Sequence, residues 1–329
     1  MGLTNFPFGI SSFGIPVMGG GGIPATFGDV YFVDYEKGSD TAHSGKDRDK
    51  AFKTLSRAYE AVTSNNNDLV LIDGYSSVVE TAMISLTKNR VHTIGLNGPP
   101  PGLGYGAGAM VTLGTTGVAS DIATLQNTGV RNTFTGIKFS NSSATATCLY
   151  TVAEGGEYTR YNHCEFYKSS LLTTDLTAEV LCNGDSSQWY GCTFGDLVNE
   201  RGASGKERPN VLLTRELITG KVARDCAFVD CLFQQKAAHV DVCFFYGPNA
   251  TDVERRLLLI RPVFWNCVKA TADPADCVNF AAAQTEGDVL LVDPVGINVT
   301  ALGGASLNIY VQGAVPTAAT TGIAVEVAA

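Results

Sequence analysis

Charged residues are scarce in this 329-residue chain: they make up 17% of it, whereas hydrophobic residues make up 45%. This composition predicts a large core and a surface with little charge. The formal net charge is −9, which argues against nucleic-acid binding because such binding needs a basic face. No apolar run reaches the ~18 residues that a transmembrane helix requires. We therefore expect neither a nucleic-acid partner nor a membrane partner.

Sequence motifs for common chemistry are also missing. The glycine run at 19–22 follows no predicted strand and opens no predicted helix, so it is not a phosphate-binding loop. Asp34, Asp40 and Asp47 are acidic but lack the spacing of an EF-hand calcium loop. No Lys or Arg precedes Lys37, which argues against an ordinary signal peptide. We expect no cofactor.

The nine Cys are an odd number in a chain too long to need disulfide staples. Three fall at one point of the repeat described below, and four lie in the strands that follow it: Cys164, Cys192 and Cys231, then Cys148, Cys182, Cys243 and Cys277. Because buried Cys packs as a small hydrophobic residue, we predict two inward columns of free thiols and synthesis in a reducing cytoplasm. The alternative, a metal site, is disfavoured because no Cys pair has C-x2-C spacing and His is rare.

A short pattern, an apolar residue two positions before a Phe, returns along the middle of the chain. Its copies end at Phe139, Phe166, Phe194, Phe233 and Phe264, at intervals of 27, 28, 39 and 31 residues. Intervals in this range indicate a repeat architecture. Each copy alternates apolar and polar residues, so each predicts a strand with one buried face. Stacked copies can bury that face together, which predicts a solenoid.

A second strand is predicted in each repeat. These strands are expected at 148–152, 180–182, 211–213, 243–246 and 277–280, and a last Phe-type strand at 289–295. The chain also contains 36 Gly, which fits an all-β protein with many turns. Variable loops lie between the strands, and the three consecutive Pro near 97–109 mark a long one.

Residues 1–28 form an uncharged segment rich in Gly, Pro and Phe. Its apolar side chains are Phe6, Phe8, Ile10, Phe13, Ile15 and Val17. A flexible leader segment is the alternative, but such segments are usually polar and charged. An uncharged apolar segment needs a surface to lie on, and we predict an extended arm that binds a partner.

After the arm, the pattern predicts a strand at 29–34, a helix at 51–63 and a buried strand at 68–73. The helix is amphipathic, with one apolar face made of Phe52, Leu55, Ala58, Tyr59 and Val62. A Gly-Ser-Asp turn at 38–40 lies between the first strand and the helix.

This order of strand, Gly-Ser-Asp turn, Ala-Phe-x-Thr-Leu helix and short strand resembles the lead-in of right-handed parallel β-helix proteins of the pectate-lyase-like superfamily. The resemblance implies an all-β, single-stranded solenoid whose helix caps the open end of the sheets. We accordingly expect the cap at 29–74, β-helix rungs at 75–295, and C-terminal strands or a cap at 296–329. Residues 1–17 also resemble the start of bacteriophage virion proteins.

Enzymes of this superfamily carry catalytic side chains on an outward face, so the outward columns of the repeat decide between enzyme and scaffold. One predicted column is Lys138, Glu165, Thr193, Leu232 and Val263, and the other is Gly136, His163, Gly191, Asp230 and Arg261. Lys138 and Glu165 would be one rung apart and able to pair. His163 and Asp230 would be about 9.6 Å apart, too far for a hydrogen-bonded dyad. The first column turns apolar at Leu232 and Val263, which we predict to be an oligomer contact.

Three pairs of carboxylates are candidates for glycoside cleavage, which needs two carboxyls about 5 to 9.5 Å apart. They are Glu154 with Glu157, Asp175 with Glu179, and Asp252 with Glu254. We interpret them instead as solvated loop charges. No catalytic residue is predicted.

Two hypotheses follow. The first is a structural, non-enzymatic virion protein: a homotrimer that decorates the outer capsid surface and binds the major capsid protein through its arm. The second is a polysaccharide-degrading enzyme, a lyase or tailspike-type depolymerase, and a non-catalytic tail or baseplate component is a neighbouring option.

Overall fold

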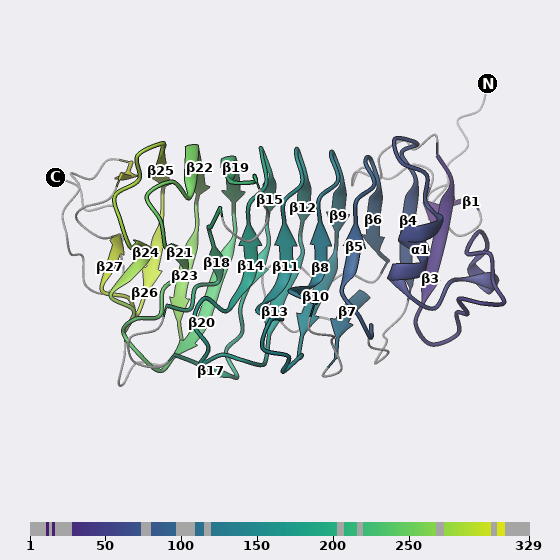
Figure 1. Ribbon diagram of the computed structural model, residues 1–329, viewed down its shortest axis with the longest axis horizontal. Helices are drawn as coiled ribbons and strands as arrows, with labels where there is room; N and C mark the ends of the chain where they lie inside the picture. Colours follow the sequence, from purple (N-terminus) through teal and green to yellow (C-terminus); the bar gives the residue numbers. More distant parts are fainter. Residues whose placement is uncertain are drawn as a thin grey trace, which may run out of the picture.

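The computed structural model is a right-handed parallel β-helix, as predicted (Figure 1). It describes residues 28–73, 80–96, 109–114, 120–202, 207–215, 220–267, 273–303 and 308–312, together with the backbone of β1 (Ser11–Ser12) and β2 (Ile15–Pro16). The predicted loop at 97–109 lies outside these residues apart from Ala109. Among the described residues no helix is long and apolar enough to cross a membrane.

Three parallel sheets run along the solenoid, and each complete rung in its middle contributes one strand to each sheet. Sheet I contains β3 (Val30–Asp34), β4 (Leu69–Asp73), β6 (His92–Gly95), β9 (Thr133–Thr135), β12 (Arg160–Asn162), β15 (Gln188–Tyr190), β19 (Ala223–Val229), β22 (Val253–Ile260), β25 (Gly287–Val292) and β28 (Ile309–Val311). Sheet II contains β7 (Ala109–Leu113), β10 (Ile137–Asn141), β13 (Glu165–Lys168), β16 (Thr193–Phe194), β20 (Leu232–Ala237), β23 (Val263–Asn266) and β26 (Val295–Ile297), and β17 (Glu200–Arg201) pairs with β20. Sheet III contains β5 (Ile84–Leu86), β8 (Ala123–Asn127), β11 (Tyr150–Glu154), β14 (Ala178–Cys182), β18 (Val211–Leu212), β21 (Phe245–Gly247), β24 (Asp276–Phe280) and β27 (Ala301–Gly303).

The sequence pattern predicted β10, β13, β16, β20 and β23 of sheet II and β11, β14, β18, β21 and β24 of sheet III, but it missed the strands of sheet I from β9 to β22. The segment at 289–295 is a related error, because Val289 to Val292 belong to β25 of sheet I. The true Phe-type strand there is β26, in which Gly296 is paired with Phe264. With a Gly at the Phe position, this rung carries no signal for the pattern to detect.

The repeated Phe side chains stack inside the solenoid. The column Phe139, Phe166, Phe194, Phe233 and Phe264 has successive ring centroids 5.7, 4.9, 4.8 and 5.4 Å apart. Sheet I adds a second aromatic stack, in which Trp189 lies 4.0 Å from Tyr161 and 5.4 Å from Phe228. Stacks of this kind repeat the same contact at every rung.

The nine Cys are all free thiols, and only Cys267 is not fully buried. Cys164, Cys192 and Cys231 follow the same corner of successive rungs, which confirms the first predicted column. The second predicted column is wrong. Cys182 is paired with Glu154 in the neighbouring rung, and the register of sheet III places Cys243 and Cys277 at different positions of their strands.

The cap helix, α1 (Leu55–Ala61), is shorter than the predicted 51–63. Phe52 instead forms a β-bridge with Val33, which holds the chain extended before the helix. The Thr54 side chain accepts a hydrogen bond from the Arg57 backbone N–H and so begins the helix. The predicted apolar face is buried at every position.

Candidate functional site

The outer face of sheet II carries the first predicted column. Strand register aligns Lys138, Glu165, Thr193, Leu232 and Val263 across successive rungs, as predicted, and extends the column to Met110 and Val295. A second outward column on this face continues past Ser140 and Tyr167 to Gly195. Gly195 is buried, and a Cβ there would clash with the backbone oxygen of Gln234, so this position accepts no side chain.

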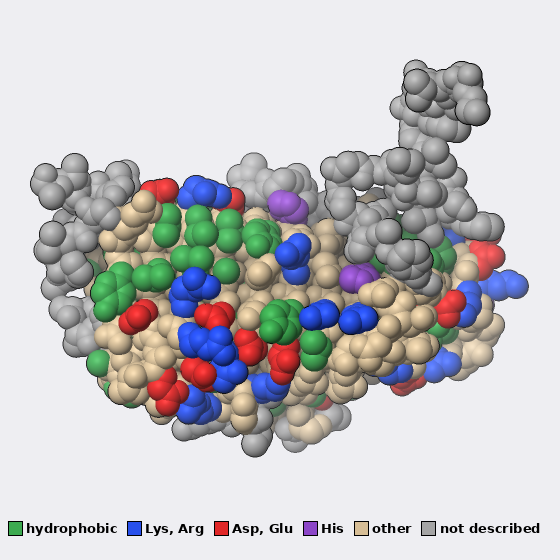
Figure 2. Space-filling model, turned by 90° about the horizontal axis from the view of Figure 1, so that it is seen from above, with side chains coloured by type: hydrophobic (Ala, Val, Ile, Leu, Met, Phe, Trp, Pro, Cys, Tyr) green, Lys and Arg blue, Asp and Glu red, His purple; other side chains and the backbone are tan. Residues whose placement is uncertain are grey.

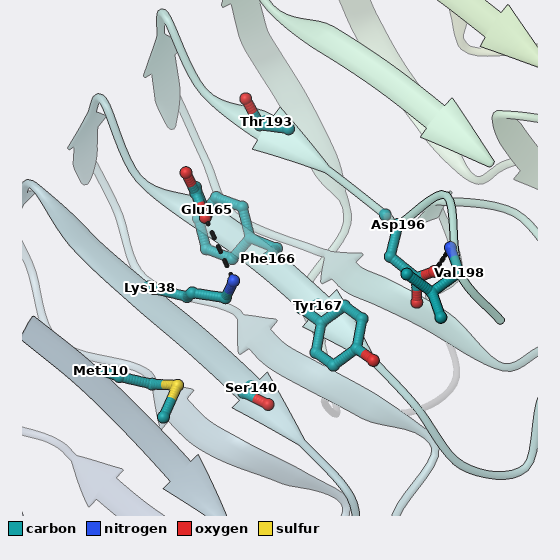
Figure 3. Close-up of a pocket in the computed structure, with 10 residues that line it drawn as sticks. Met110, Lys138, Ser140, Glu165, Phe166, Tyr167, Thr193, Asp196 and Val198 are labelled. Atoms are coloured by element: carbon teal, nitrogen blue, oxygen red, sulfur yellow. Dashed lines mark hydrogen bonds and ion pairs between the residues drawn. The ribbon is translucent and has the colours of Figure 1, made fainter. Parts of the chain in front are cut away.

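A pocket of about 220 Å³ lies on this face, over β10, β13 and β16 (Figure 3). Its polar lining includes Lys138, Glu165 and Asp196, and the ring of Tyr167 lies between them. Lys138 Nζ lies 3.5 Å from Glu165 Oε2, which confirms the predicted pairing. Lys138 Nζ also lies 5.6 Å from the centre of the Tyr167 ring.

Glu165 is the most chemically distinctive group in the pocket. Its side chain is almost completely buried, and this burial raises the pKa of its carboxyl, while the Lys138 ammonium acts to lower it. Asp196 has a different role. Its carboxylate accepts hydrogen bonds from the backbone N–H groups of Val198 and Asn199, at 2.5 and 2.7 Å, and so shapes the loop that borders the pocket.

The residues of the second predicted outward column do not lie in a β-strand. The residues His163, Asp230 and Arg261, with Gly136 and Gly191, form the corner between sheets I and II, where each has a φ between 48° and 64°. Backbone in this left-handed region turns the chain sharply after one residue. Gly191 separates His163 from Asp230, and a Cβ on Gly191 would lie 2.6 Å from His163 Nδ1. No dyad forms there, as expected.

An ion pair at this corner was not predicted. Arg261 donates from Nε and Nη2 to the two carboxylate oxygens of Asp230, at 2.6 and 2.7 Å. The pair lowers the pKa of Asp230, chiefly through the Arg261 hydrogen bond. The repeat correctly predicted that Asp230 and Arg261 lie one rung apart. It did not predict the left-handed backbone that directs their side chains toward each other.

The interpretation of the carboxylate pairs as solvated charges is wrong for one member of each pair. Glu154, Glu179 and Asp252 are completely buried. Glu154 accepts a hydrogen bond of 2.6 Å from the Tyr161 hydroxyl, and Glu179 forms an ion pair with Arg201.

The other members of these pairs lie nearer the surface. Glu157 pairs with Lys221 at 3.0 Å, and Glu254 pairs with Arg224 at 2.6 Å. Asp175 accepts a hydrogen bond of 2.9 Å from the Glu207 backbone N–H. Each pair is therefore divided between the interior and the surface, and the buried members are held by hydrogen bonds or ion pairs within the chain.

The arm residues Phe6, Phe8, Ile10, Phe13 and Val17 lie outside the described residues. Ile15 belongs to β2, whose backbone pairs antiparallel with β1. The role of the arm remains a prediction.

An apolar surface that the sequence pattern did not predict covers part of the outer face of sheet I. Two columns of partly exposed side chains extend along its C-terminal rungs, and we name them face I: Tyr190, Ala227, Val229, Leu258, Ile260, Leu290, Val292 and Tyr310. Figure 2 shows hydrophobic side chains in rows over the C-terminal half of this surface, with acidic and basic side chains gathered beside them. Tyr310 is 50% exposed. The sequence hid this face because Leu257–Ile260 of β22 and Val289–Val292 of β25 are continuous apolar runs, in which no polar residue marks the outward side.

Toward the N-terminal end the same two columns become polar. The residues at these positions are Thr133, Thr135, Arg160, Asn162 and Gln188. The change occurs within one sheet, so burial in the core does not explain it. Contiguous apolar surface of this kind marks a contact site.

No family model matches the sequence, and no curated protein matches it. Among solved structures, the pectate lyase Pel9A is 12% identical with a TM-score of 0.53, and the match covers 81% of this chain and 62% of the lyase. A pectin methylesterase mutant in complex with a hexasaccharide is 12% identical with a TM-score of 0.52, covering 89% and 92% of the two chains. The Geobacillus virus E2 protein ORF18 is 9% identical with a TM-score of 0.45, covering 86% and 62%. The first two likenesses show the parallel β-helix fold.

Proposed function

We propose that the protein is a structural component of a bacteriophage virion, an oligomeric decoration or cement protein on the outer capsid surface. In this proposal it forms a homotrimer, and its arm (residues 1–28) anchors it to the major capsid protein. The observation that carries the proposal is the apolar face I, because a solvent-facing sheet surface of this kind needs a protein partner. The resemblance of residues 1–17 to the start of phage virion proteins supports the viral setting.

The interior of the β-helix is packed as a rigid structural protein requires. Aromatic rings stack along the described rungs from Phe134 to Phe264, and the buried Glu179–Arg201 ion pair ties sheet III to β17. A solenoid packed in this way acts as a rigid post between its two ends.

Deletion of residues 2–28 tests the anchoring. Binding of the full-length and shortened proteins to assembled capsids is measured by co-sedimentation, with circular dichroism to confirm that both are folded. We expect the shortened protein to lose binding at least tenfold. Undiminished binding would refute the role of the arm.

A polysaccharide-acting enzyme is the second candidate, supported by the pocket around Glu165. A buried carboxyl with a raised pKa is suited to act as a general acid. Release of reducing or unsaturated sugar ends from host polysaccharide, abolished in Glu165→Gln, would establish this activity and overturn the structural proposal. We expect no release from either protein.

A further inference from the structure

A second apolar surface lies beside face I, on the outer side of sheet II. We name it face II, and it consists of Leu232, Val263, Trp265, Val295 and Ile297, all partly exposed. It contains the predicted contact residues Leu232 and Val263. The two faces belong to the same rungs, because one corner residue and one further residue separate Ile260 of face I from Val263 of face II.

We propose that a second copy of this chain covers each face, with face I of one copy packed against face II of the next, so that three copies form a closed ring with parallel solenoid axes. This inference rests on the proposed structural function and deepens it by naming the partner of face I.

The pairing of unlike faces follows from symmetry. Two different surfaces on one copy make a head-to-tail contact, which repeats until it closes into a ring or extends as a filament. Because face II lies on three of the rungs that carry face I, neighbouring copies can align side by side without a shift along the axis. The sharp corner between the faces turns each copy relative to the last, which closes the ring with the corners toward its centre.

The charges around the faces permit this arrangement. The corner row carries Asp230, Arg261 and Asp293, which alternate in sign, and Arg261 is already paired with Asp230. The opposite border of face I is also neutralised within the chain, by Arg224 with Glu254 at 2.6 Å and by Arg255 with Asp225 at 2.7 Å. The borders of the two faces are therefore largely neutral within one copy, although the Asp293 carboxylates of the three copies would face one another at the centre of the ring.

The size of the faces fits an interface core. Stable interfaces bury roughly 800 Å² per partner over about 20–30 residues, with an apolar centre and a polar rim. Face I supplies eight outward side chains over the rungs from β15 to β28, and the corner and border ion pairs supply the rim.

Two single-face variants of the full-length chain test the proposal. Leu258→Asp places a charge in face I, and Val263→Asp places one in face II. Thr135→Asp is the control, because Thr135 occupies an outward column of face I in the polar N-terminal half. Sedimentation velocity measures the mass of each protein, and thermal unfolding followed by circular dichroism confirms folding.

We expect the wild type and Thr135→Asp to sediment as trimers, and each face variant alone as a monomer with one third of that mass. An equimolar mixture of the two variants retains one intact pair of faces and should form a 1:1 dimer. A Val263→Asp protein that stays oligomeric would show that face I pairs with itself, and a mixture that stays monomeric would also overturn the proposal.

Capsid co-sedimentation of the wild type tests the proposed function independently of the inferred contact between faces I and II. Capsid binding by a monomeric wild type would overturn this inference and the homotrimer of the proposed function, and would leave the capsid-decorating role standing. A trimeric wild type whose two face variants form a 1:1 dimer when mixed, but which binds no capsid, would overturn the proposed function and leave the inference standing.

Discussion

Ile260 and Val263 are three residues apart in the chain, yet they face outward from two different sheets. Between them, Arg261 adopts a φ of 48°, which turns the chain from β22 into β23. The same turn recurs at the corner of each rung from Gly136 to Asp293. The corner thereby brings two apolar surfaces to the same height on the solenoid, which is the geometric basis of the proposed assembly.

The corner itself can be tested by exchanging glycine with other residues. Gly191 has a φ of 57°, and Gly191→Ala should lower the free energy of unfolding by about 1–2 kcal/mol, since left-handed backbone disfavours a Cβ. Asp293→Gly should raise it by about 0.5–1 kcal/mol for the same reason. Urea unfolding measures both, and shifts of the same sign would contradict the argument.

Trp189 is the centre of the aromatic stack of sheet I and is completely buried. Trp189→Ala should destabilise the fold by about 3–5 kcal/mol, because it leaves a cavity between Tyr161 and Phe228. Tyr158→Ala, at a ring that is 55% exposed and lies outside both faces, is the control and should reduce the free energy of unfolding far less. Equal losses in urea unfolding would show that Trp189 is not a core contact.

The ion pair between Glu179 and Arg201 is buried on both sides. Arg201→Met should cost about 3–5 kcal/mol because it leaves the Glu179 carboxylate unpaired in the interior. The double variant with Glu179→Met should recover part of that loss. Arg261→Met, which breaks the exposed pair with Asp230, should cost far less because solvent screens that pair, and a cost equal to that of Arg201→Met would contradict the distinction.

Glu207 provides a test of pH dependence. Burial, followed by the charges of Asp241 and Asp175, raises the pKa of its carboxyl to about 7. The folded state therefore holds this proton more tightly than the unfolded state, in which the pKa is about 4.3. The stabilisation is complete below the unfolded pKa and is lost as the pH rises toward 7.

The Glu207→Gln variant should remove this loss. Thermal midpoints measured from pH 4.5 to pH 7.5 should fall less steeply for Glu207→Gln than for the wild type. Glu286→Gln, at a partly exposed carboxylate paired with Arg215, is the control and should leave the slope unchanged. Identical slopes for the wild type and Glu207→Gln would refute the raised pKa.

The sequence predicted the parts of the fold whose physical signal is local. The Phe spacing predicted the inner column of sheet II, and the alternation around Lys138 and Glu165 predicted both their outward direction and their contact. The amphipathic face of the cap helix was also correct, since 3.6-residue periodicity can be read from a single segment.

The remaining features depend on tertiary context. In the runs Leu257–Ile260 of β22 and Val289–Val292 of β25, both the buried and the partly exposed residues are apolar, so the sequence does not reveal which of them face outward. Burial of Glu154 and Glu179 depends on partners from other strands, Tyr161 and Arg201, which the local sequence around each carboxylate does not indicate. The left-handed corners were hidden because Asp, His and Arg occupy positions usually given to Gly.

The mass of the full-length chain in solution tests the central claim most directly. Sedimentation equilibrium over a range of protein concentrations should give three times the chain mass of 34.7 kDa, because faces I and II each require a neighbouring copy. A mass of 34.7 kDa at every concentration would contradict the account.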